Sequence, residues 1–144
     1  MTRDVLVTIS GKRLMGTDNE DVELVTPGTY SWKSGTHIVR YDEPGEDGGN
    51  VTENMILIGG GSMQIIKRGF SNVHMSFNNS SERTTSCYST PFGDFMIGIS
   101  TNDISITESD RKIRVSVDYS MDVAEQRLSD CSINVEIVSR GPSA

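Results

Sequence analysis

The sequence predicts an all-β protein, a single closed antiparallel up-and-down β-barrel of about eight to ten strands. Short stretches in which apolar and polar residues alternate recur along the chain at spacings of about 8 to 12 residues. Clusters of glycine, proline, asparagine and aspartate separate these stretches. No segment has the apolar periodicity of an amphipathic helix. Connections this short favour a meander, and a meander can remove its unpaired edges by closing into a barrel.

The composition indicates one globular domain. The 144 residues suffice for a single hydrophobic core, so we treat residues 1–144 as one domain. The net charge of -7 repels phosphate backbones and anionic membranes, so we expect neither nucleic acid nor a membrane as a partner. No apolar run approaches the roughly 20 residues that cross a bilayer. The first ten residues, MTRDVLVTIS, lack the apolar segment of a signal peptide, so we expect a cytoplasmic protein.

The cysteine and histidine content argues against a disulfide scaffold and against a metal site. Cys87 and Cys131 are too few for a small secreted disulfide framework, and we expect both thiols to be free in a reducing cytosol. His37 and His74 lie on different predicted strands, and neither has a paired carboxylate or thiol at ligand spacing. We therefore predict no metal site and no cofactor.

Seven strands are predicted in the first half of the chain. Strict alternation begins at Val5, Val7 and Ile9, and returns at Val22 and Leu24 after an acidic, turn-rich segment, GTDNED. The other predicted strands of this half are Thr29 to Lys33, His37 to Asp42, Asn54 to Ile58, Met63 to Arg68 and Val73 to Phe77. Turn residues at 26–28, 34–35, 43–50, 59–62 and 78–81 are predicted to separate them.

The second half contains the clearest alternation. Apolar residues occupy every second position from Ile113 to Val123 and from Cys131 to Ile137, which indicates two strands that each have one solvent-exposed face. The segment AEQRLSD between them is too short for a packed helix and fits a hairpin connection. Further strands are predicted at Thr84 to Ser89, Phe95 to Ser100 and Ile104 to Thr107, with turns at Pro91-Phe92-Gly93 and Asn102-Asp103. Gly98 favours a bulge, or else a close approach by another side chain or a ligand.

Polar residues on several predicted strands suggest a ligand site at the mouth of the barrel. The segment Thr84 to Thr90 is polar on both faces, so some hydroxyl groups must point inward if this strand is central. Lys67 and Arg68 occupy opposite faces, so one of these cations points toward the interior. The alternation of residues 36–42 leaves the inward face of that strand open, and we expect Tyr41 to point inward.

The candidate ligand-binding residues combine cations and hydroxyl groups, which suit a carboxylate or phosphate, with apolar walls. They are Arg40, Tyr41, Lys67, Arg68, Met75, Phe77, Tyr88, Thr90 and Ile97. The alternative is a packed core whose cations extend to the surface.

The chain contains, in this order, DVLVTISG (4–11), TPGTY (26–30), GTHIVRYDE (35–43), KRG (67–69) with MSF (75–77), and YSTPFG (88–93) running into IGI (97–99). In this order these segments resemble the YwiB-like family of uncharacterised bacterial β-barrel proteins, also called DUF1934. The resemblance extends from Asp4 to about Val138. It implies a small closed barrel of the calycin type, similar in shape to lipocalins. It implies no established activity and no catalytic residues.

The function predicted from the sequence is non-catalytic binding of a small amphipathic or anionic ligand in the barrel. The alternative is a filled structural or regulatory barrel that acts through protein–protein contacts, with another protein or a second copy of the chain as partner. An enzyme ranks third, because His37 near Tyr41 is the only candidate acid–base pair and spacing identifies no catalytic residue.

Overall fold

The computed structural model is an all-β protein. It describes residues 1–15, 18–44, 51–69, 72–79, 83–123 and 126–140, and within them the side chains of all but residues 12–15, 18–22, 44, 90, 123 and 126–129. None of the described residues forms a helix long and apolar enough to span a membrane. The strands are β1 (Asp4–Met15), β2 (Asp18–Lys33), β3 (Thr36–Pro44), β4 (Val51–Gly59), β5 (Ser62–Arg68), β6 (Val73–Phe77), β7 (Thr84–Thr90), β8 (Gly93–Glu108), β9 (Lys112–Val123) and β10 (Gln126–Ser139).

All ten of these strands belong to one antiparallel sheet, which curls into a nearly closed barrel. The strand order is β6-β5-β4-β3-β2-β1-β10-β9-β8-β7, so consecutive strands pair with each other except β6 and β7, and β1 pairs with β10. The two end strands, β6 and β7, meet at an antiparallel bridge in which Asn72 and Ser89 exchange backbone hydrogen bonds of 2.9 Å. The predicted single meander barrel is therefore confirmed, with closure at one bridge rather than along a full ladder.

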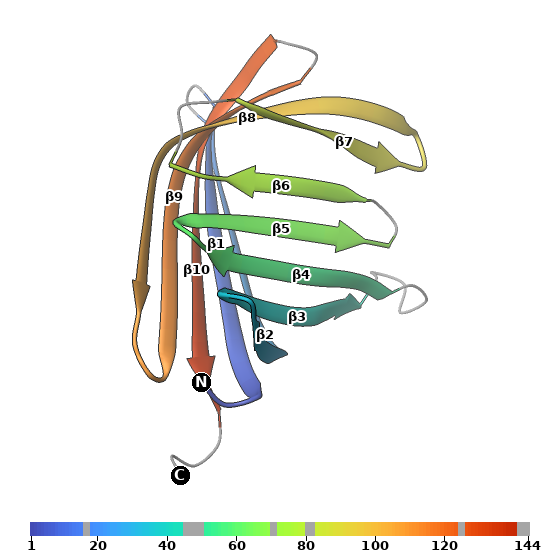
Figure 1. Ribbon diagram of the computed structural model, residues 1–144. Helices are drawn as coiled ribbons and strands as arrows, with labels where there is room; N and C mark the ends of the chain where they lie inside the picture. Colours follow the sequence, from blue (N-terminus) through green and yellow to red (C-terminus); the bar gives the residue numbers. More distant parts are fainter. Residues whose placement is uncertain (16–17, 45–50, 70–71, 80–82, 124–125, 141–144) are drawn as a thin grey trace.

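Two long strands pair with different neighbours along their length. β2 pairs with β1 as far as Thr29 and then pairs with β3 from Thr29 to Lys33. β8 pairs with β7 up to Ile99 and with β9 from Ile97 onward. As a result β3 to β7 cross the long strands β1, β9 and β10 at a steep angle (Figure 1). The two groups of strands face each other across one core.

Three local predictions were wrong. The segment 26–28 lies inside β2, and Asn102-Asp103 lies inside β8. In both places the strand continues without ending. Asn102 has no partner in the ladder with β9, so it forms a bulge. Gly98 pairs regularly with both neighbouring strands, so it is not a bulge. The Arg83 side chain lies where a Cβ atom of residue 98 would be, so a close approach explains this glycine.

The middle of the barrel is packed with apolar side chains. Inward-pointing residues of β1, β3 to β6, β9 and β10 have no solvent-accessible surface, among them Val7, Val39, Ile56, Phe77 and Val115. A side chain with no accessible surface lines no void large enough for water. The rings of Phe77 and Tyr119, from opposite walls, have centroids 4.9 Å apart. The core therefore joins both walls.

Arg83 ties the start of β7 to β9. Its Nε donates to Asp122 Oδ2 at 2.9 Å, and its Nη2 donates to the other carboxylate oxygen. These hydrogen bonds lower the pKa of Asp122 from its ordinary value. Because the same guanidinium covers Gly98 of β8, one side chain links β8 and β9 to the start of β7, at the end of that strand away from the closing bridge.

Replacing the ring at the centre of the core tests this packing. Phe77→Ala should lower the free energy of unfolding by about 3–5 kcal/mol, because it removes buried apolar surface and leaves a cavity. Urea denaturation measures this change. Phe92→Ala is the matched control, since Phe92 is 89% exposed, and it should cost less than about 1 kcal/mol. Equal losses for the two variants would contradict the assignment of the core.

The Arg83–Asp122 contact predicts a pH-dependent contribution to stability. Because the pKa of Asp122 is lower in the folded protein than its ordinary value of 3.8, the contact stabilises the fold at neutral pH and loses its effect as the pH falls through the folded pKa. Arg83→Gln should therefore be less stable than the parent protein at pH 7, and the difference should shrink toward pH 3. Denaturation across this range gives the measurement. A difference that stays constant with pH would refute the ionic contribution, and Arg68→Gln, which removes an exposed cation of β5, should show no such trend.

Candidate functional site

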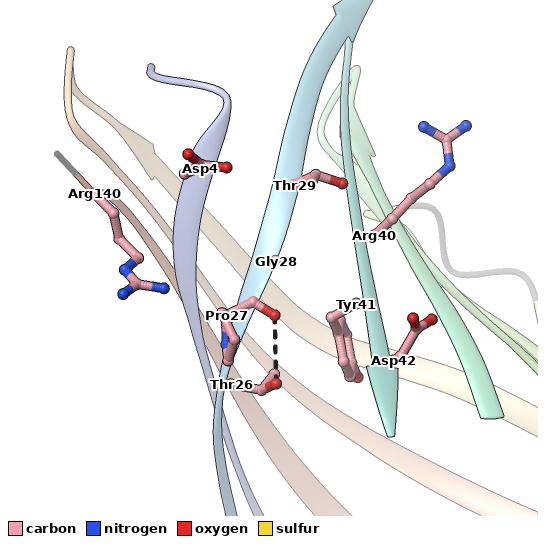
Figure 2. Close-up of a pocket in the computed structure, with 9 residues that line it drawn as sticks. All are labelled: Asp4, Thr26, Pro27, Gly28, Thr29, Arg40, Tyr41, Asp42 and Arg140. Atoms are coloured by element: carbon pink, nitrogen blue, oxygen red, sulfur yellow. Dashed lines mark hydrogen bonds between the residues drawn. The ribbon is translucent and has the colours of Figure 1, made fainter. Parts of the chain in front are cut away.

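A groove of about 800 Å³ lies on the outer surface where β2 and β3 separate. The ladder between these strands ends at Thr29 and Arg40, after which β2 follows β1 and β3 follows β4. Figure 2 shows the residues that line the groove. They are Asp4, Thr26, Pro27, Gly28, Thr29, Arg40, Tyr41, Asp42 and Arg140.

Pro27 explains why the two strands separate at this point. The backbone N–H of Tyr30 donates toward β1, to the carbonyl of Arg3, at 2.7 Å. Because successive residues of a strand point their backbone groups to opposite sides, the nitrogen of Pro27 points toward β3. Proline has no N–H to donate, so the ladder cannot continue there. The carbonyl of Pro27 accepts a hydrogen bond from Thr26 Oγ1 at 3.3 Å instead (Figure 2).

Gly28 lets the two strands pass close to each other at the point of separation. A Cβ atom at this position would lie 2.9 Å from the carbonyl oxygen of Arg40 and 3.0 Å from Val7 Cγ2. The first of these contacts is with backbone, which cannot rotate away as a side-chain end can. Glycine is therefore required by the close approach of β3.

Tyr41 lies between the two strands and lines the groove from below (Figure 2). The residue is only 4% exposed, on the inner face of β3 as expected. No hydrogen bond joins its hydroxyl to another described residue. Burial, and then the negative charge of Glu43, raise the pKa of Tyr41 above its ordinary value. The hydroxyl is therefore a neutral group that can donate one hydrogen bond to a ligand.

Four charged side chains surround the groove with alternating sign. Asp4 pairs with Thr29, and Thr29 pairs with Arg40. The backbone N–H of Arg140, the residue after β10, donates to the carbonyl of Asp4 at 2.8 Å. None of Asp4, Arg40, Asp42 and Arg140 forms an ion pair with another residue that the structure describes. Both guanidinium groups are thus available to an anionic group.

The groove brings together two of the nine predicted site residues, Arg40 and Tyr41. Six of the nine point to the inside of the barrel, as the pairing of β3 to β8 shows: Tyr41, Lys67, Met75, Phe77, Tyr88 and Ile97. Arg40 and Arg68 lie on the outer face and are exposed. The side chain of Thr90 lies outside the described residues. The predicted set therefore does not form one site.

The inner residues at the Tyr41 end of the barrel form a polar row. Tyr41 pairs with Asn54, and Asn54 pairs with Lys67. Lys67 Nζ lies 3.2 Å from Glu43 Oε1, and both side chains are about one-third exposed, at 36% and 33%. Asn54 is 3% exposed, and its buried Oδ1 has no partner among the described residues. This row is polar because it stands at the open end of the barrel, one layer beyond the packed core.

His37 does not act together with Tyr41. The two residues point to the inside of β3 with the fully buried Val39 between them. His37 Nε2 lies 2.9 Å from Glu108 Oε1, and its Nδ1 lies 2.8 Å from Tyr30 Oη. Because a carboxylate only accepts, Nε2 carries the proton and Nδ1 accepts the hydrogen bond of Tyr30. These two hydrogen bonds connect the β2–β3 hairpin to the end of β8 and form a structural link across the barrel.

Sequence reasoning missed most of the groove. The sequence predicts a turn at Pro27 and Gly28, and no motif marks Asp4, Asp42 and Arg140 as members of one site. The available clue was the pair Pro27-Gly28 between two alternating segments, since proline within a sheet marks a place without a partner strand. Sequence alone does not show that β10 ends beside this place, so Arg140 could not be found.

A methyl group at residue 28 tests the geometry of the groove. Gly28→Ala should lower the free energy of unfolding by about 1–3 kcal/mol, because the added Cβ meets the backbone of Arg40 and forces the strands apart. Thermal or urea unfolding measures the loss. Gly11→Ala in β1 is the control, because its Cβ would lie at an ordinary 3.6 Å from the Ser132 carbonyl. If both alanine variants have the stability of the parent protein, Gly28 is not the close-approach point.

Comparison with known proteins supports the fold and gives a family. The crystal structure of the ywiB protein from Bacillus subtilis superposes with a TM-score of 0.83 at 18% sequence identity, covering 96% of this chain and 93% of that one. This likeness concerns the fold alone. No curated protein matches the sequence. The pattern of the domain of unknown function DUF1934 matches residues 7–135, and the chain therefore belongs to the DUF1934 family.

Proposed function

We propose that this protein binds a small anionic or amphipathic molecule without chemical change, and that the molecule occupies the groove between β2 and β3. One observation carries the proposal. The groove presents the guanidinium groups of Arg40 and Arg140, which have no ion-pair partner among the described residues, and the hydroxyl of the buried Tyr41, which has no hydrogen-bond partner among them. Its volume of about 800 Å³ is that of a small-molecule site.

The donors of the groove suit an anionic group. Arginine binds carboxylates and phosphates through paired, charge-assisted hydrogen bonds. The Tyr41 hydroxyl adds a neutral donor, and Pro27 with the edge of the Tyr41 ring provides an apolar surface. Asp4 and Asp42 accept N–H or O–H groups, so the preferred ligand carries such donors as well as its negative charge.

The packed core supports placing the ligand in the groove rather than in the centre of the barrel. Inner residues that were expected to line a cavity, such as Phe77, have no accessible surface. A ligand there would have to displace core side chains, at a cost of several kcal/mol. The proposal therefore keeps the ligand class expected from the sequence and moves its site outward, to the place where the wall of the barrel parts.

We also propose a cytosolic location and a relationship in shape to calycin-type binding barrels. Cys87 is exposed and Cys131 is buried, and neither forms a disulfide. Free thiols are the usual state in a reducing compartment, which supports the cytosol. The nearly closed meander of strands supports the calycin comparison.

A second candidate function is a filled barrel that acts through protein–protein contacts. Apolar side chains gather on the β7–β8 hairpin, where Phe92, Phe95 and Met96 are 89%, 47% and 54% exposed. Exposed aromatic and methionine side chains are typical of contact surfaces. Under this hypothesis the partner is another protein or a second copy of the chain.

The anionic, amphipathic dye 8-anilinonaphthalene-1-sulfonate is a suitable probe of the groove. Its sulfonate should bind between the guanidinium groups, and its rings should lie on the apolar surface at Pro27. Arg40→Gln should weaken dye binding about tenfold or more, because it removes a charge-assisted hydrogen bond. Fluorescence titration of the native protein measures the dissociation constant.

The control for this titration is Arg68→Gln, which removes an exposed arginine of β5 that does not line the groove. Its dissociation constant should stay within about twofold of the parent value. Equal effects of the two substitutions would exclude the groove as the site. Dye binding that is instead lost in Phe92→Ser, with Arg40→Gln unaffected, would favour the contact surface on the β7–β8 hairpin.

A further inference from the structure

Barrel closure places three metal-binding side chains side by side on the outer face of β6, β7 and β8. Cys87 and Met96 are direct cross-strand partners. The bridge between Asn72 and Ser89 brings β6 beside β7, and His74 and Cys87 lie two residues beyond it on these two strands. His74, Cys87 and Met96 thus form a row across three strands that lie next to one another, in the order β6, β7, β8 (Figure 1).

A second contact joins β6 and β7 on the far side of this row. Thr84 Oγ1 donates to the carbonyl oxygen of Ser76 at 3.3 Å. The two strands are thus held together at Asn72 and Ser89 on one side of the row and at Ser76 and Thr84 on the other. His74 and Cys87 lie between these two contacts, so they cannot be far apart.

All three side chains point outward. Val73 and Ile97, the chain neighbours of His74 and Met96, are buried, with only 7% of each residue exposed, and they point inward. Because side chains alternate along a strand, His74 and Met96 point to the outer face, where Met96 is 54% exposed. Cys87 is an exposed free thiol. A metal ion can therefore reach all three from solvent.

His74 is already oriented as a ligand. Its Nε2 lies 2.7 Å from Gln64 Oε1 on β5. The amide oxygen only accepts, so Nε2 carries the proton and Nδ1 carries the free lone pair. The two ring nitrogens point in widely divergent directions, so Nδ1 is turned away from the Gln64 amide on β5. A hydrogen bond from the second ring nitrogen to a protein acceptor is the usual support of a metal-bound histidine.

We propose that His74 Nδ1, Cys87 Sγ and Met96 Sδ form a binding site for one soft monovalent copper ion. Thiolate and thioether sulfur select Cu(I) over hard cations, and imidazole is compatible with it. Binding exchanges the thiol proton of Cys87 for the metal, so one proton is released per ion and no oxidant or reductant is needed. No group of three or more His, Cys, Asp and Glu residues suited to a metal occurs in the described part of the chain, and this row reaches three donors through its methionine. The site is independent of the groove between β2 and β3.

Anaerobic titration of the native protein with Cu(I), in competition with the chromogenic chelator bicinchoninate, tests this site. The parent protein should withdraw one equivalent of Cu(I) from the chelator and show thiolate-to-copper charge-transfer absorption in the ultraviolet. Cys87→Ala should abolish both effects. His74→Ala and Met96→Leu should each weaken binding about 10–100-fold, because each removes one ligand.

Met55→Leu is the matched control for Met96→Leu. Met55 also points outward, but it lies on β4, and β5 and β6 separate it from Cys87. This variant should bind Cu(I) as the parent does, and circular dichroism should show that all variants are folded. In nitrogen-15 spectra of labelled histidine, Nδ1 of His74 should shift on metal binding by much more than Nε2.

Several results would overturn the proposal. The parent protein could fail to withdraw Cu(I) from the chelator. His74→Ala and Met96→Leu could bind as tightly as the parent, which would mean that the thiolate alone holds the ion. Binding could also persist in Cys87→Ala, which would assign the metal to Cys131. None of these outcomes bears on dye binding at Arg40, so the experiments test the copper site and the groove independently.

Discussion

The structure depends on two strands that each belong to both walls of the barrel. β2 and β8 are 16 residues long, and each changes its pairing partner part-way along. A flat sheet of ten strands would expose one apolar face, and the bends of β2 and β8 fold that face onto itself. Val7 and Ile137 of one wall and Ile56 and Phe77 of the other consequently share one core. The bends also determine where the surface opens.

Each bend leaves a different opening in the wall. At β2 the missing N–H of Pro27 ends the ladder with β3, and the absent side chain of Gly28 lets the two backbones cross closely. The groove and its unpaired charges are the direct consequence. On the other side of the barrel, β6 and β7 share one backbone bridge, at Asn72 and Ser89, and a side-chain hydrogen bond from Thr84 to the carbonyl of Ser76. Arg83, bonded to Asp122, separately fastens the start of β7 to β9.

The packed interior moves the search for function to the surface of the barrel. The side chains in the middle of the barrel leave no space for water, and the polar residues next to them, Asn54 and Lys67, stand at one end. At the opposite end, His37 is engaged with Tyr30 and Glu108. The groove at Arg40 and the outer row at Cys87 are two places in the described part of the chain where donor groups meet solvent. Both occur where strands separate or barely meet, because a continuous ladder leaves less room between its side chains.

The sequence by itself determined the strands and their faces. The strict alternation from Ile113 to Val123 predicted both the strand and its buried side, because a strand points every second residue to the same face. Turn chemistry was a weaker guide. Pro27-Gly28 and Asn102-Asp103 are turn formers locally, yet pairing with β1 and β9 carries the strands through them, because ladder hydrogen bonds and core contacts outweigh a local preference. Only the tertiary structure decided which strands meet after a full turn of the barrel. The neighbourhoods of Arg140 with Asp4, and of His74 with Cys87, depend on closure, and no spacing along the chain encodes them.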